Sequence, residues 1–235
     1  MDTQTRHALK NDKFALAAVH GADWLGEHKS SVLRWVIGVV AGLALVVGGI
    51  AFWTTRSSAA EAALGSAVDL YATPLAMPGA PAEPGVYNTG ADRAKEANRE
   101  FVAIEHDFGW LPAGTKARYF AGVTYAEMGQ NGAAEKELTA ASHSWDHNVA
   151  NLAKLALAGV YRQTSRDNEA IEIYNQIVAK PSTTVSAAVA QLDLADLYSA
   201  EGKTDMAKAL WAKVKDSDKD GAAGQIAEQK LSPKQ

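Results

Sequence analysis

The most prominent pattern along the chain is an unbroken apolar run from Trp35 to Trp53, WVIGVVAGLALVVGGIAFW. It contains no charged residue, no amide side chain and no proline, so an α-helix over this range would be apolar on every side. At about 1.5 Å of rise per residue the helix would span roughly 28 Å, close to the hydrocarbon thickness of a bilayer. The run has a tryptophan at each end, and indole rings prefer the lipid headgroup region. The flanking Arg34 and Arg56 can extend their charged ends into the same region. The run therefore predicts one transmembrane helix over residues 35–53.

The basic residues around this run predict its orientation. Only Arg56 is basic in the twenty residues that follow it, whereas five basic residues precede it: Arg6, Lys10, Lys13, Lys29 and Arg34. Because basic flanks resist translocation, residues 1–34 are expected in the cytoplasm and the rest of the chain on the far side of the membrane. A cleaved signal peptide is the alternative, since residues 58–60 are small. The long leader and the long apolar run favour an uncleaved anchor.

Residues 1–34 carry a weaker helical pattern, with Leu9, Phe14, Ala18 and Val19 toward one side. Two interpretations stay open. The segment is either a helix that docks on a cytoplasmic partner or lies along the inner leaflet, or a tail that only fixes the topology.

Within the apolar run, Gly38 and Gly42 form a G-x-x-x-G pair. Small residues four apart allow two helix backbones to approach closely in lipid. The two glycines are therefore candidates for a contact with a second membrane helix, although glycine is also common in membrane helices without such a contact.

Beyond the apolar run, apolar residues recur at helical spacing, alanine is abundant and β-branched runs are short. Residues 57–71 predict a helix that can continue directly from the run. Residues 73–90 hold four of the seven prolines and predict an exposed insertion, with a polyproline-type ligand as the less favoured alternative. The helical pattern resumes at Asp92 and ends before Gly109 and Pro112. The fold class is therefore all-α.

The rest of the chain repeats one pattern three times. Tyr125, Tyr161 and Tyr198 are 36 and 37 residues apart. A small residue precedes each tyrosine by three, an alanine follows by nine, a large residue by thirteen and an apolar residue by sixteen. In that order the matched positions are Gly122, Ala158 and Ala195; Ala134, Ala170 and Ala207; Leu138, Tyr174 and Trp211; and Ala141, Ile177 and Val214. Gly129 and Gly202 fall in the turns of the first and third units.

These residues and this spacing resemble the tetratricopeptide repeat, a helix–turn–helix unit of about 34 residues. The resemblance implies an α-solenoid of three to four helix pairs over residues 57–235, in which small residues let paired helices approach and large ones fill the gap to the next unit. Tyr71 with Ala97, Phe101 and Ile104 would form a further, degenerate unit. A helix over about 222–231 would cap the last one.

The whole chain is similar to the YfgM-like family of bacterial inner-membrane proteins. The resemblance rests on the order of a single anchor, a degenerate first unit, three better units and a short C-terminal cap. It implies a short cytoplasmic N-terminus, a periplasmic tetratricopeptide-repeat-like domain, and an ancillary role at the Sec translocon together with periplasmic chaperones.

The inner face of the first helix of each pair is the expected site of protein binding, because these helices line the concave side of such an array. A mostly apolar face would suit an extended or helical segment of another protein. By the repeat consensus, its residues are Tyr119, Val123, Leu152, Leu155, Arg162, Val189, Leu192 and Asp196.

The charge balance argues against nucleic-acid binding, and the motif content argues against catalysis. Residues 57–235 carry 17 basic and 23 acidic residues, so no basic field exists to hold nucleic acid. The chain has no cysteine, and it contains no nucleophile-elbow, zincin, Walker or dinucleotide-binding motif. No catalytic residue and no cofactor is predicted.

Two segments resemble metal sites but are interpreted otherwise. Residues 216–221, DSDKDG, match the opening of an EF-hand loop, but the twelfth position is Ala227 instead of a bidentate glutamate. A turn that caps the following helix is favoured. His143 and His147 are four residues apart without a firm third ligand, so a zinc site is not predicted.

Two functions therefore remain. The first is a non-catalytic scaffold of the Sec translocon that contacts its subunits and periplasmic chaperones. The alternative is an adaptor for another cell-envelope assembly complex.

Overall fold

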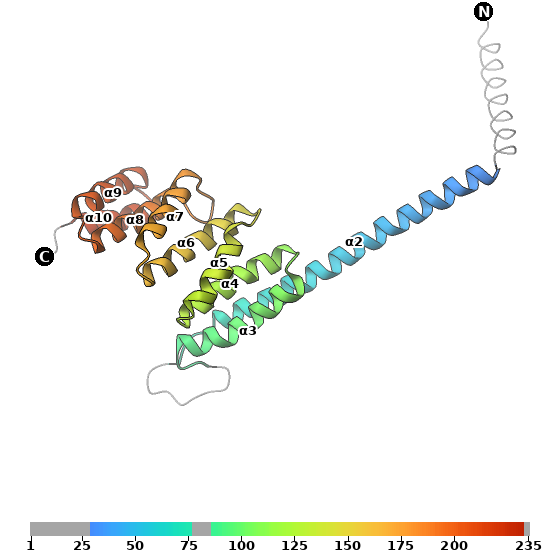
Figure 1. The fold of residues 1–235 in the computed structure, drawn as a ribbon, viewed down its shortest axis with the longest axis horizontal. Coiled ribbons are helices and arrows are strands. Elements are labelled where there is room, and N and C mark those ends of the chain that lie inside the picture. The colour runs from blue at the N-terminus through green and yellow to red at the C-terminus, as the bar shows by residue number, and fades with distance from the viewer. Residues whose placement is uncertain (1–28, 77–85, 233–235) are drawn as a thin grey trace, which may run out of the picture. The chain divides into compact units, whose positions relative to one another are not determined.

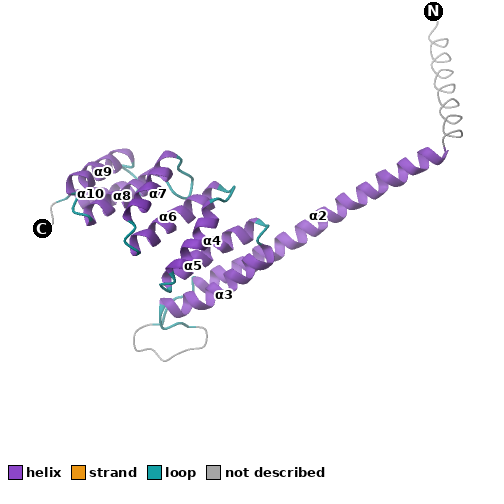
Figure 2. Cartoon of the chain, viewed as in Figure 1, coloured by secondary structure: helices purple, strands orange, loops and turns teal. Residues whose placement is uncertain are grey.

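The structure is a computed structural model that describes residues 29–76 and 86–232. The predicted helical pattern around Phe14 and the middle of the proline-rich insertion lie outside the described residues. The described part of the chain forms nine α-helices, and its only β-type pairing is an isolated bridge between Leu75 and Tyr87 (Figures 1 and 2). The all-α prediction is confirmed for these residues. The helices are α2 (Lys29–Tyr71), α3 (Gly90–Phe108), α4 (Pro112–Glu127), α5 (Asn131–Ser142), α6 (His147–Gln163), α7 (Asp167–Ala179), α8 (Ala187–Ala200), α9 (Thr204–Ser217) and α10 (Ala222–Leu231).

The chain divides into two compact units, Met1–Thr55 and Arg56–Gln235, and the boundary falls inside α2. We call them the N-terminal unit and the repeat unit. Helix α2 runs without interruption from the apolar run to Tyr71, so the predicted continuation of the helix is confirmed.

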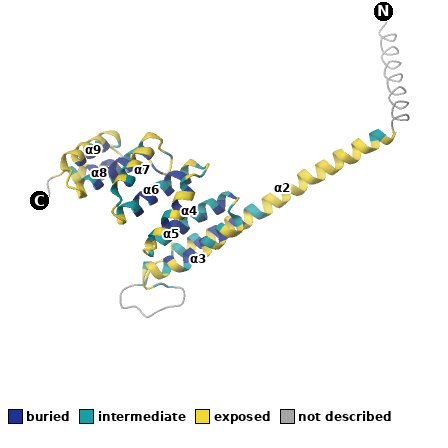
Figure 3. Ribbon diagram, viewed as in Figure 1, coloured by how far each residue is buried: buried dark blue, intermediate teal, exposed yellow. Residues whose placement is uncertain are grey.

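In the N-terminal unit, the apolar side chains of α2 are exposed. Every residue from Trp35 to Thr55 is open to solvent (Figure 3). Among the described helices, α2 alone is long and apolar enough to cross a membrane by length and composition. An added Cβ at Gly38 or Gly42 would meet nothing within 4 Å, so both positions of the G-x-x-x-G pair lie on open helix surface.

In the repeat unit, each helix from α3 to α10 packs against its neighbour in sequence. The three predicted repeats are the pairs α4–α5, α6–α7 and α8–α9, and α10 follows as the predicted terminal helix (Figure 1). The matched alanines of the second helices, Ala134, Ala170 and Ala207, have no exposed surface. The large residues that follow them, Leu138, Tyr174 and Trp211, are buried as well. The repeated sequence positions are thus the contact positions between helices.

The turn within each pair contains one residue in the left-handed region, at the fourth position after the repeat tyrosine. Gly129 and Gly202 have φ of 70° and 76° there, as glycine readily allows. Ser165 occupies the same position in the second pair with φ of 58°. A serine in this region is strained, because its Cβ crowds the backbone.

Replacing Ser165 with glycine is therefore expected to stabilise the repeat unit by about 0.5–1 kcal/mol, since relief of strain outweighs the added entropy of the unfolded chain. The midpoint of urea unfolding, followed by circular dichroism, measures the effect. Gly202→Ser is the mirror control and should lower the midpoint. An equal or lower midpoint for Ser165→Gly would show that the turn carries no strain.

The first helix pair of the repeat unit combines the end of α2 with α3. Phe101 is fully buried; its ring stacks on Phe120 at 4.9 Å between centroids and meets Tyr71 edge-on at 6.2 Å. Ala97 and Ile104 are buried in the same cluster. The residues expected to form a degenerate unit before the three repeats thus share one core.

Hydrogen bonds join the two ends of the proline-rich insertion. Ala76 donates its backbone N–H to the carbonyl of Tyr87 at 2.9 Å, and Nη1 of Arg93 donates to the carbonyl of Thr73 at 2.9 Å. Thr89 then caps α3 by accepting a hydrogen bond from the backbone N–H of Asp92. An insertion closed in this way can be accommodated without separating α2 from α3.

Candidate protein-interaction surface

Five of the eight residues predicted to bind a partner pack against the same main hydrophobic cluster. They are half-buried, and they come from the first helices of all three pairs. We call them the apolar face: Tyr119 and Val123 on α4, Leu152 and Leu155 on α6, and Val189 on α8. Because each side chain packs on the core with one part and meets solvent with the other, the face is apolar and also held in place.

Leu192 and Asp196 have a different role in the structure. Leu192 is only 9% exposed and belongs to the cluster formed by α8, α9 and α10. Asp196 accepts hydrogen bonds from Nε1 of Trp211 at 3.1 Å and from Nζ of Lys230 at 2.9 Å. Both residues therefore hold the last helices against α8 instead of belonging to the apolar face.

Arg162, the eighth residue, lines a groove of about 620 Å³ between the end of α6 and the end of α8. The groove is lined by Gly159, Arg162, Gln163, Asp167, Leu197, Ala200 and Glu201. Its mixed polar and apolar lining can accept hydrogen bonds as well as apolar contacts from a peptide segment.

The charge of Arg162 acts on two half-buried or buried groups nearby. Burial raises the pKa of Asp193, Arg162 opposes this rise, and Asp196 adds to it. Burial also raises the pKa of the Tyr174 hydroxyl; Asp193 adds to this effect and Arg162 reduces it. Asp193 is thus a carboxylate whose loss of hydration is not fully compensated by its cationic neighbour.

Replacing Asp193 with asparagine is expected to raise the thermal midpoint at pH 7. A raised native pKa favours the folded state only when the carboxyl is protonated, below its unfolded pKa of about 3.9, and this contribution is lost as pH rises through the native pKa. The ionised carboxylate therefore destabilises the folded state at neutral pH. The stabilisation by asparagine should shrink as the pH falls to about 3, below the unfolded pKa, because the carboxyl is then protonated in both states.

Thermal melts at the two pH values measure this difference, with Asp69→Asn at an exposed position of α2 as the control for the substitution itself. A lower midpoint for Asp193→Asn at neutral pH would mean that the attraction to Arg162 exceeds the cost of burial.

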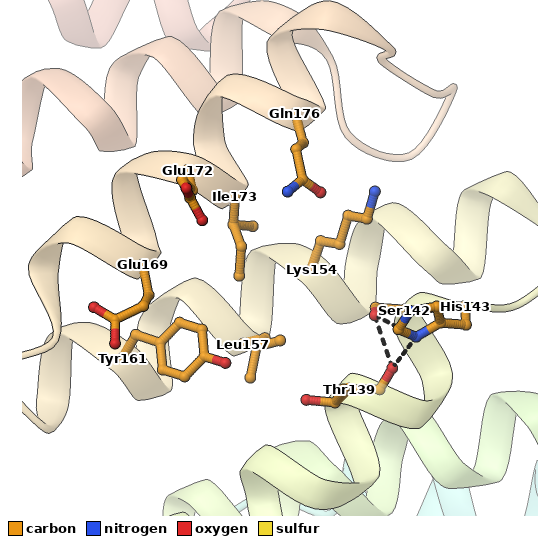
Figure 4. Close-up of a pocket in the computed structure, with 10 residues that line it drawn as sticks. All are labelled: Thr139, Ser142, His143, Lys154, Leu157, Tyr161, Glu169, Glu172, Ile173 and Gln176. Atoms are coloured by element: carbon orange, nitrogen blue, oxygen red, sulfur yellow. Dashed lines mark hydrogen bonds between the residues drawn. The ribbon is translucent and has the colours of Figure 1, made fainter.

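A second groove, of about 340 Å³, lies where the end of α5 meets α6 and α7 (Figure 4). Leu157 and Ile173 are buried at its floor, and the other lining residues are polar or only partly buried. The lining residues are Thr139, Ser142, His143, Lys154, Leu157, Tyr161, Glu169, Glu172, Ile173 and Gln176. Sequence reasoning did not find this groove, because its lining residues come from three helices and share no pattern along the chain.

The segments that resemble metal sites have local roles in the structure. His143 follows the last residue of α5, and its Nδ1 lies 2.8 Å from the carbonyl oxygen of Thr139. Residues 29–76 and 86–232 contain no group of three or more histidine, cysteine, aspartate or glutamate side chains placed to hold a metal ion.

The segment of residues 216–221 spans the end of α9 and the turn that follows. Its Asp218 carboxylate accepts a hydrogen bond at 3.2 Å from the backbone N–H of Gly224 in the first turn of α10. The turn therefore caps the next helix, as the favoured sequence interpretation expected.

A family model described as a tetratricopeptide repeat-like domain matches residues 24–231. No curated protein matches the chain. The matched range covers the apolar run of α2 as well as the helix pairs.

Proposed function

Because the chain belongs to the tetratricopeptide repeat-like domain family, we propose that it is a membrane-anchored scaffold that binds other proteins through its repeat unit. Domains of this kind are in general interaction modules without catalytic activity. The observation that carries the proposal is the apolar face: five half-buried apolar side chains from α4, α6 and α8 at the edge of one core.

The proposed anchor is the apolar run of α2. Its exposed side chains, its length and its composition support a membrane span, and the family match includes this range. The distribution of basic residues supports an N-terminus in the cytoplasm and a repeat unit in the periplasm, with the anchor in the bacterial inner membrane. In this arrangement Gly38 and Gly42 are available for a contact with another membrane helix.

The more specific proposal is an ancillary role at the Sec translocon, where the repeat unit would bring periplasmic chaperones to emerging proteins. The support for it is the order of anchor, degenerate unit, three repeats and cap, which resembles the YfgM-like family. A shallow apolar face suits an extended or helical protein segment, the form in which unfolded clients and docking peptides are presented.

Photocrosslinking in intact cells tests this function. A benzophenone amino acid replaces the partly exposed Tyr119 on the apolar face and keeps its first phenyl ring, and the same amino acid at the exposed Trp145 is the control. Adducts with Sec channel subunits or chaperones at position 119, and not at 145, are expected. Adducts with cell-wall or outer-membrane assembly proteins would support an adaptor role instead. Equal adducts at both positions would argue against the apolar face.

Replacing Leu155 with glutamate should lower the yield of the adducts at position 119 by about 10-fold or more, because a charge at the centre of an apolar contact removes a main source of binding energy. Asn175→Glu, at an exposed position of α7, adds the same charge elsewhere and should leave the yield unchanged. Circular dichroism of both variants checks that the helices are retained. An unchanged yield for Leu155→Glu would contradict binding at this face.

A further inference from the structure

The groove of about 340 Å³ beside Leu157 follows the antiparallel helices α6 and α7 (Figure 4). Nδ2 of Asn151, near the start of α6, donates a hydrogen bond at 2.9 Å to the carbonyl oxygen of Lys180, directly after α7. The start of α6 therefore lies beside the end of α7. Lys154 and Gln176, which both line the groove, form this end of it.

The opposite end of the groove carries a net negative charge. Tyr161 and Glu169 line it there, next to the turn between the two helices. The Arg166 guanidinium lies 4.2 Å from the centroid of the Tyr161 ring. Its Nε donates to Oε1 of Glu169 at 2.9 Å, and its Nη1 donates to Oε1 of Glu135 at 2.8 Å. Two carboxylates thus share one cation, and one negative charge is left over.

The groove also holds one unpaired charge of each sign. Lys154, half-buried on α6, and Glu172, exposed on α7, both line it and take part in no ion pair or hydrogen bond among the described residues. Glu172 lies one helical turn before Gln176, about 6 Å along α7, so the free carboxylate and the free ammonium are displaced along the groove. A cation whose hydration is reduced by burial is stabilised by a carboxylate that reaches it.

The floor of the groove is apolar and faces away from the apolar face. Leu157 and Ile173, at 5% and 8% exposure, lie between the two charged ends. On α6, the residues that line the groove are roughly 150° around the helix axis from Leu152 and Leu155, at about 100° per residue. A ligand in the groove and a protein on the apolar face can therefore bind at the same time.

We propose that this groove binds a free peptide of about three residues, with its carboxylate at Lys154 and its ammonium beside Glu172 and Glu169. Lys154 and Tyr161 are seven residues apart on α6, which corresponds to about 10 Å. An extended peptide spans roughly 3.3–3.6 Å per residue, so three residues match this length. The amide of Gln176 can donate a second hydrogen bond to the carboxylate, and the central side chain lies on the apolar floor. The inference goes beyond the proposed function and needs neither the membrane span nor the apolar face.

Fluorine NMR of the full-length chain in detergent tests the proposal. The probe is the tripeptide alanyl-leucyl-alanine with trifluoroleucine at its centre, because neither the protein nor the detergent contributes a fluorine signal. Line broadening across a titration measures the affinity. We expect saturable binding, and a loss of affinity of about 5-fold or more when the peptide is N-acetylated or C-amidated, since each change removes a charge-assisted contact.

Two variants assign each terminus of the peptide to its partner. Lys154→Gln should weaken binding of the free peptide about as much as amidation does, and it should abolish the difference between the free and the amidated peptide. Glu172→Gln should reduce the corresponding difference for the acetylated peptide. Lys208→Gln on α9 and Glu100→Gln on α3, both at exposed positions, are the matched controls and should change neither the affinity nor its dependence on the termini.

Three results would overturn the proposal. The first is no saturable binding, or equal affinity of the free and the two blocked peptides. The second is a loss of affinity on amidation alone, which would assign the groove to the C-terminus of a longer chain instead of a free peptide. The third is an amidation effect that persists in Lys154→Gln, which would place the carboxylate elsewhere. None of these results bears on crosslinking at position 119, which tests the apolar face.

Discussion

Phe101→Ala is expected to lower the free energy of unfolding of the repeat unit by about 3–5 kcal/mol, the usual cost of truncating a fully buried phenylalanine. Phe101 has no exposed surface and joins the end of α2 to α3 and α4 by its contacts with Tyr71 and Phe120. Its removal leaves a cavity where α2, α3 and α4 meet around three aromatic rings. The surrounding backbone consists of regular helices, which close such a cavity poorly.

The effect is measured as the shift of the urea midpoint of the full-length chain in detergent, followed by circular dichroism. Trp145→Ala removes an even larger side chain at an exposed position and should change the free energy by less than about 0.5 kcal/mol. Each helix pair is stabilised by contacts with the pairs next to it in the array. The α2–α4 end can therefore unfold before the later pairs, and the unfolding curve would then show a first transition of reduced amplitude. A shift for Phe101→Ala no larger than that of the control would contradict the packing described above.

Gly114→Ala is expected to cost about 3 kcal/mol, at the upper end of overpacking substitutions, although it adds a single methyl group. An added Cβ would overlap the carbonyl oxygen of Phe108, lie 2.5 Å from its carbonyl carbon and lie 2.7 Å from Cα of Gly109. All three are backbone atoms, so no side-chain rotation can relieve the overlap. The α3–α4 turn must shift, although Leu111 and Arg56 hold it in place.

Gly65→Ala is the matched control. Gly65 is also helical, but an added Cβ there meets nothing within 4 Å, so alanine should stabilise α2 by about 0.5–1 kcal/mol. Thermal and urea unfolding of both variants measure the difference in sign. Equal effects of the two substitutions would show that the close approach at Gly114 does not exist.

The repeat pattern alone does not predict where a small residue must be glycine. Gly122, Ala158 and Ala195 occupy equivalent positions, and the pattern assigns all three the same role. In the structure a Cβ at Gly122 would lie 2.6 Å from Cγ of Leu138, so the first pair packs closer than alanine permits. The pattern predicts a small residue, but only the packing of the two helices decides that it must be glycine.

The residues predicted to bind a partner show the same limit. Tyr119, Leu155 and Leu192 are equivalent repeat positions, six residues before the tyrosine of each unit, and the sequence predicts all three for the partner-binding surface. The first two are half-buried at the edge of the main cluster, whereas Leu192 is buried between α8, α9 and α10. Asp196 is likewise drawn into contacts with Trp211 and Lys230. At the C-terminal end of the repeats, α10 covers the last pair. Residues of α8 that contact it are therefore buried, whereas the equivalent residues of earlier pairs stay partly exposed.

From the sequence alone, the all-α fold, the continuous first helix and the helix–turn–helix repeats could be predicted, because each depends on interactions between residues near one another in the chain. Helical spacing of apolar residues, small residues at helix contacts and glycine in two of the three turns are all local signals. The grooves beside Arg162 and Leu157, the burial of Leu192 and the fastening of the α3–α4 turn by Arg56 depend on residues that are far apart in sequence. Only the tertiary structure decides these, since they follow from which helix surfaces the packing covers and which it leaves exposed.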